Sequence, residues 1–174
     1  MKEAKEALAV QDFTKMGGYN LYGYGVNITM HTQKEMKDMN KLHKLDTVYL
    51  NIAKEISTLS HCERSKVGAL IVKDNNIISF GYNGTPAGMD NCCERHGVTV
   101  AEVIHAEMNA ILKAAKTGHS VDGASLYLTL SPCVDCAKLI LQSGIKRVVY
   151  IDQYRKTDGI DFLKQFIDIS KYEI

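Results

Sequence analysis

Three features that would direct this protein toward a large charged partner or a membrane are missing from its sequence. The formal net charge is only +1, and there is no long run of Lys or Arg, which argues against strong non-specific affinity for a polynucleotide backbone. No apolar run approaches the roughly 20 residues that a membrane span needs. Residues 1–5 also lack the apolar stretch of a secretory signal. We therefore expect a cytoplasmic protein that binds neither nucleic acid nor membrane.

Internal repeats and low-complexity blocks are absent as well. The length of 174 residues favours one domain with a single sizeable core. The five cysteines are an odd number, and Cys133 and Cys136 have Cys-x-x-Cys spacing. In a cytoplasmic chain this pattern favours metal or redox chemistry over a framework of disulfides.

From residue 45 onward the apolar residues follow regular periods. The expected elements are a helix over 45–60, strands over 67–72 and 76–82, a helix over 105–117, a strand over 125–130, a helix from Pro132 to about Gly144, a strand over 146–151, a helix capped by Asp158, and a short final strand over 169–174. Asp74 and Asn75 predict the turn of an antiparallel hairpin. The two strand–helix–strand units predict parallel pairing with right-handed crossovers. The order indicates an α/β sandwich around a mixed sheet.

The first 43 residues differ from the rest, so we divide the chain into an N-terminal extension, 1–43, and a main domain, 44–174. Residues 17–25 are rich in Gly and Tyr and have no clear period, and Gly makes regular structure costly. The extension is either a loosely ordered arm or an arm that packs its tyrosines on a neighbouring subunit. It contains no catalytic motif.

Two short motifs indicate a catalytic metal. His105, Cys133 and Cys136 supply three ligands that suit zinc and leave a fourth position open for water. Both motifs lie at predicted helix N-termini, where the helix dipole helps to keep thiols ionised. Zinc lowers the pKa of a bound water from about 15.7 to about 7. Glu107, two residues after His105, is placed to face the open position and to move protons.

Neither motif is specific by itself. A Cys-x-x-Cys pair also occurs in redox sites and in structural zinc sites. The combination of His-x-Glu with Pro-Cys-x-x-Cys is far more specific, because it is the signature of zinc deaminases. The Gly/Pro loop over residues 83–88 follows a predicted strand and is either a ligand-binding loop or a simple turn.

From about residue 45 to its end, the chain resembles deoxycytidylate (dCMP) deaminases, particularly the compact phage-type enzymes. The matching segments are residues 62–69, 81–88, 105–110, 131–138 and 142–146. The resemblance implies the cytidine-deaminase fold, a three-layer α/β/α sandwich with a central mixed sheet of five strands. It also implies hydrolysis of dCMP to dUMP and ammonia, which supplies dUMP for thymidylate synthesis, in the host cytoplasm if the chain is phage-encoded.

The same resemblance implies a role for individual residues. His105, Cys133 and Cys136 would hold Zn²⁺, and Glu107 would be the proton shuttle. The substrate contacts it implies are Asn83 to the deoxyribose, the backbone at Ala106 and Ser131 to the pyrimidine, and Arg64 and Lys66 near the phosphate.

Regulation is implied by the resemblance alone. Family members are commonly homohexamers that dCTP activates, together with Mg²⁺, and dTTP inhibits. Such an effector would bind at Gly84, Thr85, Pro86 and Gly88 and at residues of a neighbouring subunit. Some relatives carry a second, structural zinc, for which Cys62, Cys92 and His96 are the candidates here.

Three alternatives remain open from the sequence. In the first alternative, the substrate is a 5-modified dCMP or another pyrimidine nucleotide, because the zinc motifs act on C4 whatever group stands at C5. An RNA adenosine deaminase shares the zinc residues, but the near-neutral charge and the loop at residues 81–84 argue against it. A non-enzymatic binding module with a structural zinc is the third.

Overall fold

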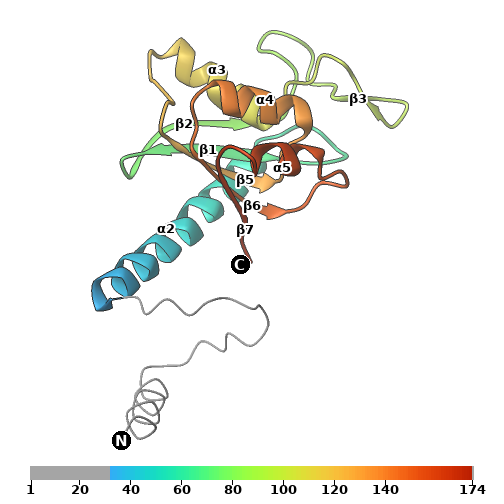
Figure 1. The fold of residues 1–174 in the computed structure, drawn as a ribbon. Helices are drawn as coiled ribbons and strands as arrows, with labels where there is room; N and C mark the ends of the chain where they lie inside the picture. Colours follow the sequence, from blue (N-terminus) through green and yellow to red (C-terminus); the bar gives the residue numbers. More distant parts are fainter. Residues whose placement is uncertain (1–31, 174) are drawn as a thin grey trace, which may run out of the picture. The chain divides into compact units, whose positions relative to one another are not determined.

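The computed structural model describes residues 32–173. Its centre is a five-stranded mixed sheet in the order β2-β1-β5-β6-β7 (Figure 1). The strands are β1 (Gly68–Lys73), β2 (Asn76–Tyr82), β5 (Ser125–Leu130), β6 (Arg147–Asp152) and β7 (Asp168–Lys171). Strand β1 runs antiparallel to both β2 and β5, whereas β5–β6 and β6–β7 are parallel pairs. The predicted hairpin, the parallel pairing and the final strand are confirmed.

Helices cover both faces of this sheet (Figure 1). The four described helices are α2 (Gln33–Ser57), α3 (Ala106–Lys116), α4 (Val134–Gln142) and α5 (Asp158–Leu163). One core packs Leu50 and Ala53 of α2 against Leu70 of β1 and Val149 of β6. The opposite core joins the alternate residues of the same strands to α3, α4 and α5. Strands with apolar side chains on both faces explain this layering, and the predicted three-layer sandwich is confirmed.

Helix α2 begins at Gln33, well before the predicted start at residue 45. The signal missed was a capping box: Glu35 N–H donates to Thr32 Oγ1 (3.3 Å), and Thr32 N–H donates to the Glu35 carboxylate (2.6 Å). Apolar periodicity could not show this start, because the turns before His43 are exposed on every side. The predicted arm over residues 17–25 lies outside the described residues.

Two further local predictions are corrected. The residue at the N-cap of α5 is Thr157, and Asp158 lies in the first turn, where its charge suits the helix dipole. Residues 92–102, which show no pattern in the sequence, contain a small antiparallel hairpin of β3 (Glu94–Arg95) and β4 (Val98–Thr99). Its turn has positive φ at His96 (53°) and Gly97 (73°), as a tight hairpin turn requires. Strands of two residues are too short to give a period.

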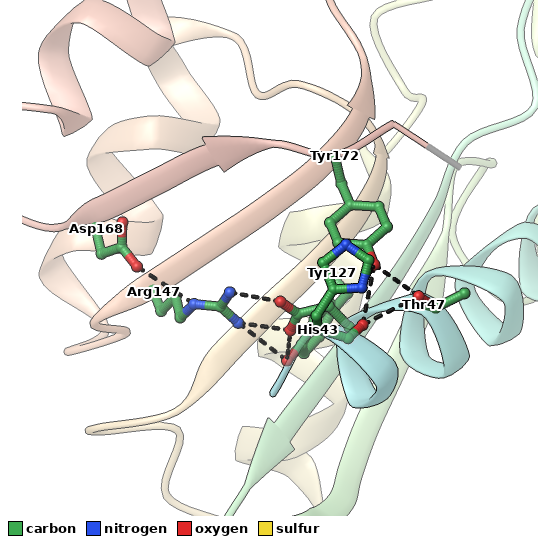
Figure 2. A network of polar contacts seen from close by, with 7 residues as sticks. His43, Thr47, Tyr127, Arg147, Asp168 and Tyr172 are labelled. Carbon is green, nitrogen blue, oxygen red and sulfur yellow. Dashed lines mark hydrogen bonds and ion pairs between the residues drawn. The ribbon is translucent and has the colours of Figure 1, made fainter. Parts of the chain in front are cut away.

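A buried polar network fastens α2 to the sheet (Figure 2). Asp46, only 4% exposed, accepts two hydrogen bonds from the Arg147 guanidinium (2.8 and 2.7 Å) and one from the Tyr127 hydroxyl (2.9 Å). The exposed Asp168 flanks the same guanidinium at 3.3 Å. Nearby, the Tyr172 hydroxyl contacts His43 and Thr47. This network joins residues about a hundred positions apart in sequence, as the separation of 101 between Asp46 and Arg147 shows.

Within residues 32–173, none of the helices combines the length and apolar character needed to cross a membrane.

Candidate active site

The candidate metal ligands come from the starts of two helices on the same face of the sheet. His105 is the N-cap of α3, Cys133 is the N-cap of α4, and Cys136 follows in the first turn of α4. An isolated bridge between Gly84 and Ile104 brings the chain before α3 alongside the segment that follows β2. Strand β5 leads directly into the segment that carries Cys133. These two connections bring together ligands separated by 28 residues.

Two glycines allow these helix starts to approach their neighbours. A Cβ at Gly81 in β2 would collide with the carbonyl oxygen of Ala106, so the first turn of α3 lies directly on the strand. A Cβ at Gly159 in α5 would collide with the carbonyl oxygen of Pro132, just before the start of α4. Both helix starts are therefore held by backbone contacts that only glycine permits.

The three ligand atoms have the spacing of a metal site. His105 Nδ1 lies 3.6 Å from Cys133 Sγ and 3.4 Å from Cys136 Sγ, and all three atoms lie within 4.8 Å of one another. Tetrahedral zinc, with Zn–S of about 2.3 Å and Zn–N of about 2.0 Å, separates its ligand atoms by about 3.5–3.8 Å. The donor set and its spacing therefore fit zinc with one position left open.

The protonation of these side chains is strongly coupled. Hydrogen bonds with Cys136 and His105 lower the pKa of Cys133 to about 3. The hydrogen bond to Cys133, together with burial, raises the pKa of the Cys136 thiol. The hydrogen bond with Cys133 also raises the pKa of His105. The ligands thus share protons that a divalent cation would displace on binding.

Glu107 lies beside these ligands in the first turn of α3 and is 4% exposed. Burial raises the pKa of its carboxyl, although a hydrogen bond from its own backbone N–H acts in the opposite direction. Its side chain also interacts with that of Cys136. A carboxyl that holds its proton more tightly than usual is suited to general acid–base work near neutral pH.

A pocket of about 520 Å³ opens above these residues. Its lining includes His105, Glu107 and Cys133, together with the predicted substrate contacts Arg64, Asn83, Ala106 and Ser131. Lys66 is exposed and does not belong to this lining. Gly84, Thr85, Pro86 and Gly88, the residues of the predicted effector site, do not line this pocket either. The role of each of these residues stays a prediction.

Two pocket walls were missed by sequence analysis. The β3–β4 hairpin contributes Glu94, Val98 and Thr99, and the segment after β6 contributes Gln153, Tyr154 and Arg155. Neither segment has a motif. The one available signal was position, because loops that follow strands of an α/β sheet at the same edge tend to carry ligand contacts.

Two predicted substrate residues also hold the pocket together. The Asn83 side chain accepts from Val67 N–H and donates to the Ser65 carbonyl, both at 2.8 Å. The Ser131 hydroxyl accepts from Tyr154 N–H at 2.8 Å. Asn83 therefore orders the loop before β1, and Ser131 orders the segment after β6.

The residues predicted for a second zinc are not gathered as ligands. Cys62 forms a disulfide with Cys93, with their Cα atoms 5.1 Å apart, a pairing that the odd cysteine count did not predict. The exposed Cys92 thiol contacts the Glu94 carbonyl oxygen at 3.1 Å. In the part of the chain that the structure describes, His105, Cys133 and Cys136 are the one group of three or more such side chains close enough to hold a metal.

A three-ligand metal site, with a buried acid beside it on an α/β/α sandwich, defines an enzyme of the zinc-dependent deaminase class. The family described as "Cytidine and deoxycytidylate deaminase zinc-binding region" matches residues 43–152. The chain therefore belongs to the cytidine and deoxycytidylate deaminase family, and the resemblance noted in the sequence is confirmed.

Individual relatives agree with this assignment. The deoxycytidylate deaminase of Enterobacteria phage T4 is 41% identical over 155 residues, which covers 65% of this chain and 80% of that protein. The crystal structure of a dCMP deaminase from cyanophage S-TIM5, in complex with dCMP and dUMP, is 44% identical, with a TM-score of 0.71 over 82% of this chain and 100% of that one. A structure from a study of tRNA:A34 deaminases is more distant, at 26% identity and a TM-score of 0.54 over 72% of this chain and 91% of that one.

Proposed function

We propose that this protein hydrolyses dCMP to dUMP and ammonia. The observation on which the proposal rests is the group His105, Cys133 and Cys136 with the buried Glu107 beside it. His105, Glu107 and Cys133 line a pocket that two arginines also line. The greater similarity to dCMP deaminases than to the tRNA deaminase structure supports a mononucleotide over RNA. The deaminase domain, on this proposal, spans residues 44–174.

The chemistry divides between a metal and this chain's own residues. Zinc held by His105, Cys133 and Cys136 would lower the pKa of a water so that hydroxide is available for addition to C4 of the cytosine ring. Glu107 would accept one proton from that water and donate it to N3 of the ring; it would then accept the proton of the hydroxyl added at C4 and donate it to the departing amine. Its burial keeps bulk water away from that transfer. The sum is loss of ammonia and gain of one oxygen at C4.

Regulation is part of the same proposal. Resemblance to the family supports a homohexamer in the cytoplasm that dCTP activates with Mg²⁺, that dTTP inhibits, and whose dUMP feeds thymidylate synthesis. The proposal is supported by the lining of the substrate pocket, which does not include Gly84, Thr85, Pro86 or Gly88, because an allosteric effector binds at a site distinct from the substrate.

A substrate panel tests the proposal. Ammonia release is measured for dCMP, CMP, 5-methyl-dCMP, dCTP, deoxycytidine and an RNA stem-loop, each with and without added dCTP and Mg²⁺. We expect dCMP to be the best substrate. If 5-methyl-dCMP is turned over faster, the alternative of a 5-modified substrate is correct. If none of them releases ammonia from zinc-loaded protein, the proposal fails.

A further inference from the structure

One wall of the pocket is a hairpin that lies outside the central sheet. Strands β3 and β4 form their own two-stranded sheet (Figure 1), and Glu94, Val98 and Thr99 of this hairpin line the pocket. The loop between α2 and β1 lines the same pocket through Arg64 and Ser65. The shape of the pocket therefore depends on how the hairpin is fastened to that loop.

The hydrogen bonds from the hairpin to this loop are exposed to solvent. The Glu94 carboxylate accepts from the backbone N–H groups of Glu63 (3.2 Å) and Arg64 (3.4 Å). The Arg64 guanidinium donates to the Thr99 hydroxyl at 3.1 Å. In the described part of the chain, these are the side-chain hydrogen bonds that join residues 92–99 to other segments. Because water competes for exposed donors and acceptors, each contributes little to holding the wall in place.

A disulfide fastens the hairpin covalently to the same loop. Cys93, just before β3, is bonded to Cys62, which lies 31 residues earlier in the chain. Both residues are buried, at 2% and 1% exposure. The Cys62 N–H donates to the Ser60 hydroxyl at 3.2 Å, and that hydroxyl donates to the Asn83 carbonyl at 2.8 Å. The disulfide therefore ties the hairpin to a buried anchor beside Asn83, another residue of the pocket lining.

In the cytoplasm, where the proposed function places this protein, disulfides are usually transient and redox-sensing. A dithiol reduces such a bond through a mixed disulfide: two electrons and two protons pass to the sulfurs of Cys62 and Cys93, and the dithiol becomes a disulfide. Because both residues are buried, this attack requires the hairpin to open locally, which its exposed hydrogen bonds permit. We propose that the Cys62–Cys93 disulfide is a redox switch that fixes the hairpin wall when oxidised and releases it when reduced. This inference rests on the proposed function, whose substrate site the switch regulates.

The switch should act on substrate binding and leave the chemical step unchanged. His105 and Glu107 belong to the start of α3, and Cys133 and Cys136 to the start of α4, so none of them lies on the hairpin. A wall that is in place about a tenth of the time after reduction raises KM about 10-fold, because apparent affinity falls with the populated fraction of the binding-competent state. The expected signature is therefore a change in KM at constant kcat and constant zinc content.

The test compares zinc-loaded, full-length protein before and after treatment with tris(carboxyethyl)phosphine, which produces the same two thiols as a dithiol. Alkylation of denatured protein should find the three free thiols Cys92, Cys133 and Cys136 before treatment and all five cysteines after it. We expect reduction to raise KM for dCMP and the Kd for dUMP about 10-fold, and reoxidation with a small-molecule disulfide to restore both. Metal analysis on the same samples checks that zinc is retained.

Two variants assign the effect to this bond. The double variant Cys62→Ala with Cys93→Ala should behave like the reduced wild type and should not respond to the phosphine. Cys92→Ser changes the neighbouring exposed cysteine, which is outside the disulfide, and should respond like the wild type.

Amide hydrogen exchange over residues 94–99 separates this inference from the proposed function, because it needs no substrate. Faster exchange in this segment on reduction supports the release of the wall even if dCMP is not turned over. The inference is overturned if the untreated protein shows five free thiols after oxidation, if exchange is the same in both redox states, or if reduction changes KM equally in the wild type and in the double variant.

Discussion

The two faces of the central sheet each carry a cluster of ionisable side chains, and the two clusters differ in how their charges are satisfied. On the face covered by α2, Asp46 and Arg147 meet in a two-point ion pair that Tyr127 completes (Figure 2). On the opposite face, the ligand atoms of His105, Cys133 and Cys136 lie within 4.8 Å of one another, and their hydrogen bonds raise the pKa of His105 and lower that of Cys133. Glu107 beside them has no ion pair and a raised pKa.

Under the proposed function, this difference separates a structural cluster from a catalytic one. In the first, every charge has a partner within the chain, so adding a ligand would gain nothing. In the second, donors that compete for shared protons become complete only with a cation, and a carboxyl with a shifted pKa stays able to exchange its proton. Four predictions test the comparison, in order of expected effect.

Metal removal should abolish activity while leaving the Asp46 cluster intact. A strong chelator is expected to reduce ammonia release to background and to expose the thiols of Cys133 and Cys136 to alkylation, because these thiols are then no longer ligands. Metal analysis should find one zinc per chain bound at this site, absent from His105→Ala. Full activity in protein shown to be free of metal would contradict the interpretation of His105, Cys133 and Cys136 as a catalytic metal site.

Glu107→Gln should lower kcat by roughly 10³- to 10⁴-fold, because the amide cannot accept or donate the required proton. The variant should keep its zinc and bind dUMP, since Glu107 is not one of the three ligands. Rapid-quench kinetics and metal analysis on the same preparation give both readouts. Turnover within a few-fold of the wild type would show that another group moves the proton.

Asp46→Asn should destabilise the fold by about 3–5 kcal/mol, because it leaves the half-buried Arg147 guanidinium with only the exposed Asp168 as an ionic partner. Urea unfolding measures this change. At low temperature, where the variant is folded, kcat should stay close to that of the wild type, because the cluster lies on the face away from the site. A large loss of kcat in fully folded protein would show that the two clusters are coupled.

Asp168→Asn serves as the matched control and should have the smallest effect, below about 1 kcal/mol, because its side chain is 66% exposed and solvent screens the pair with Arg147. If this variant were as unstable as Asp46→Asn, burial would not explain the strength of the network.

Local patterns predicted most of the fold. The alternation of strands and helices from residue 67 onward is confirmed, because apolar periods and turn residues act over a few positions. The start of α2 was missed although Thr32 and Glu35 form a capping box, since a helix end exposed on every side has no apolar period. The N-cap of α5 was predicted at Asp158, one residue after Thr157, where the structure has it.

The sequence by itself determined the candidate metal site and the acid beside it. His105, Glu107, Cys133 and Cys136 are each specified by short spacings, and each pair opens a helix. Only the tertiary structure decided what surrounds that site: the hairpin wall, the disulfide between Cys62 and Cys93, and the segment that carries Arg155. The physical reason is the distance along the chain between the residues that specify each feature. A helix start is set by neighbours within one turn, whereas a pocket wall depends on how segments with no pattern of their own pack against a sheet.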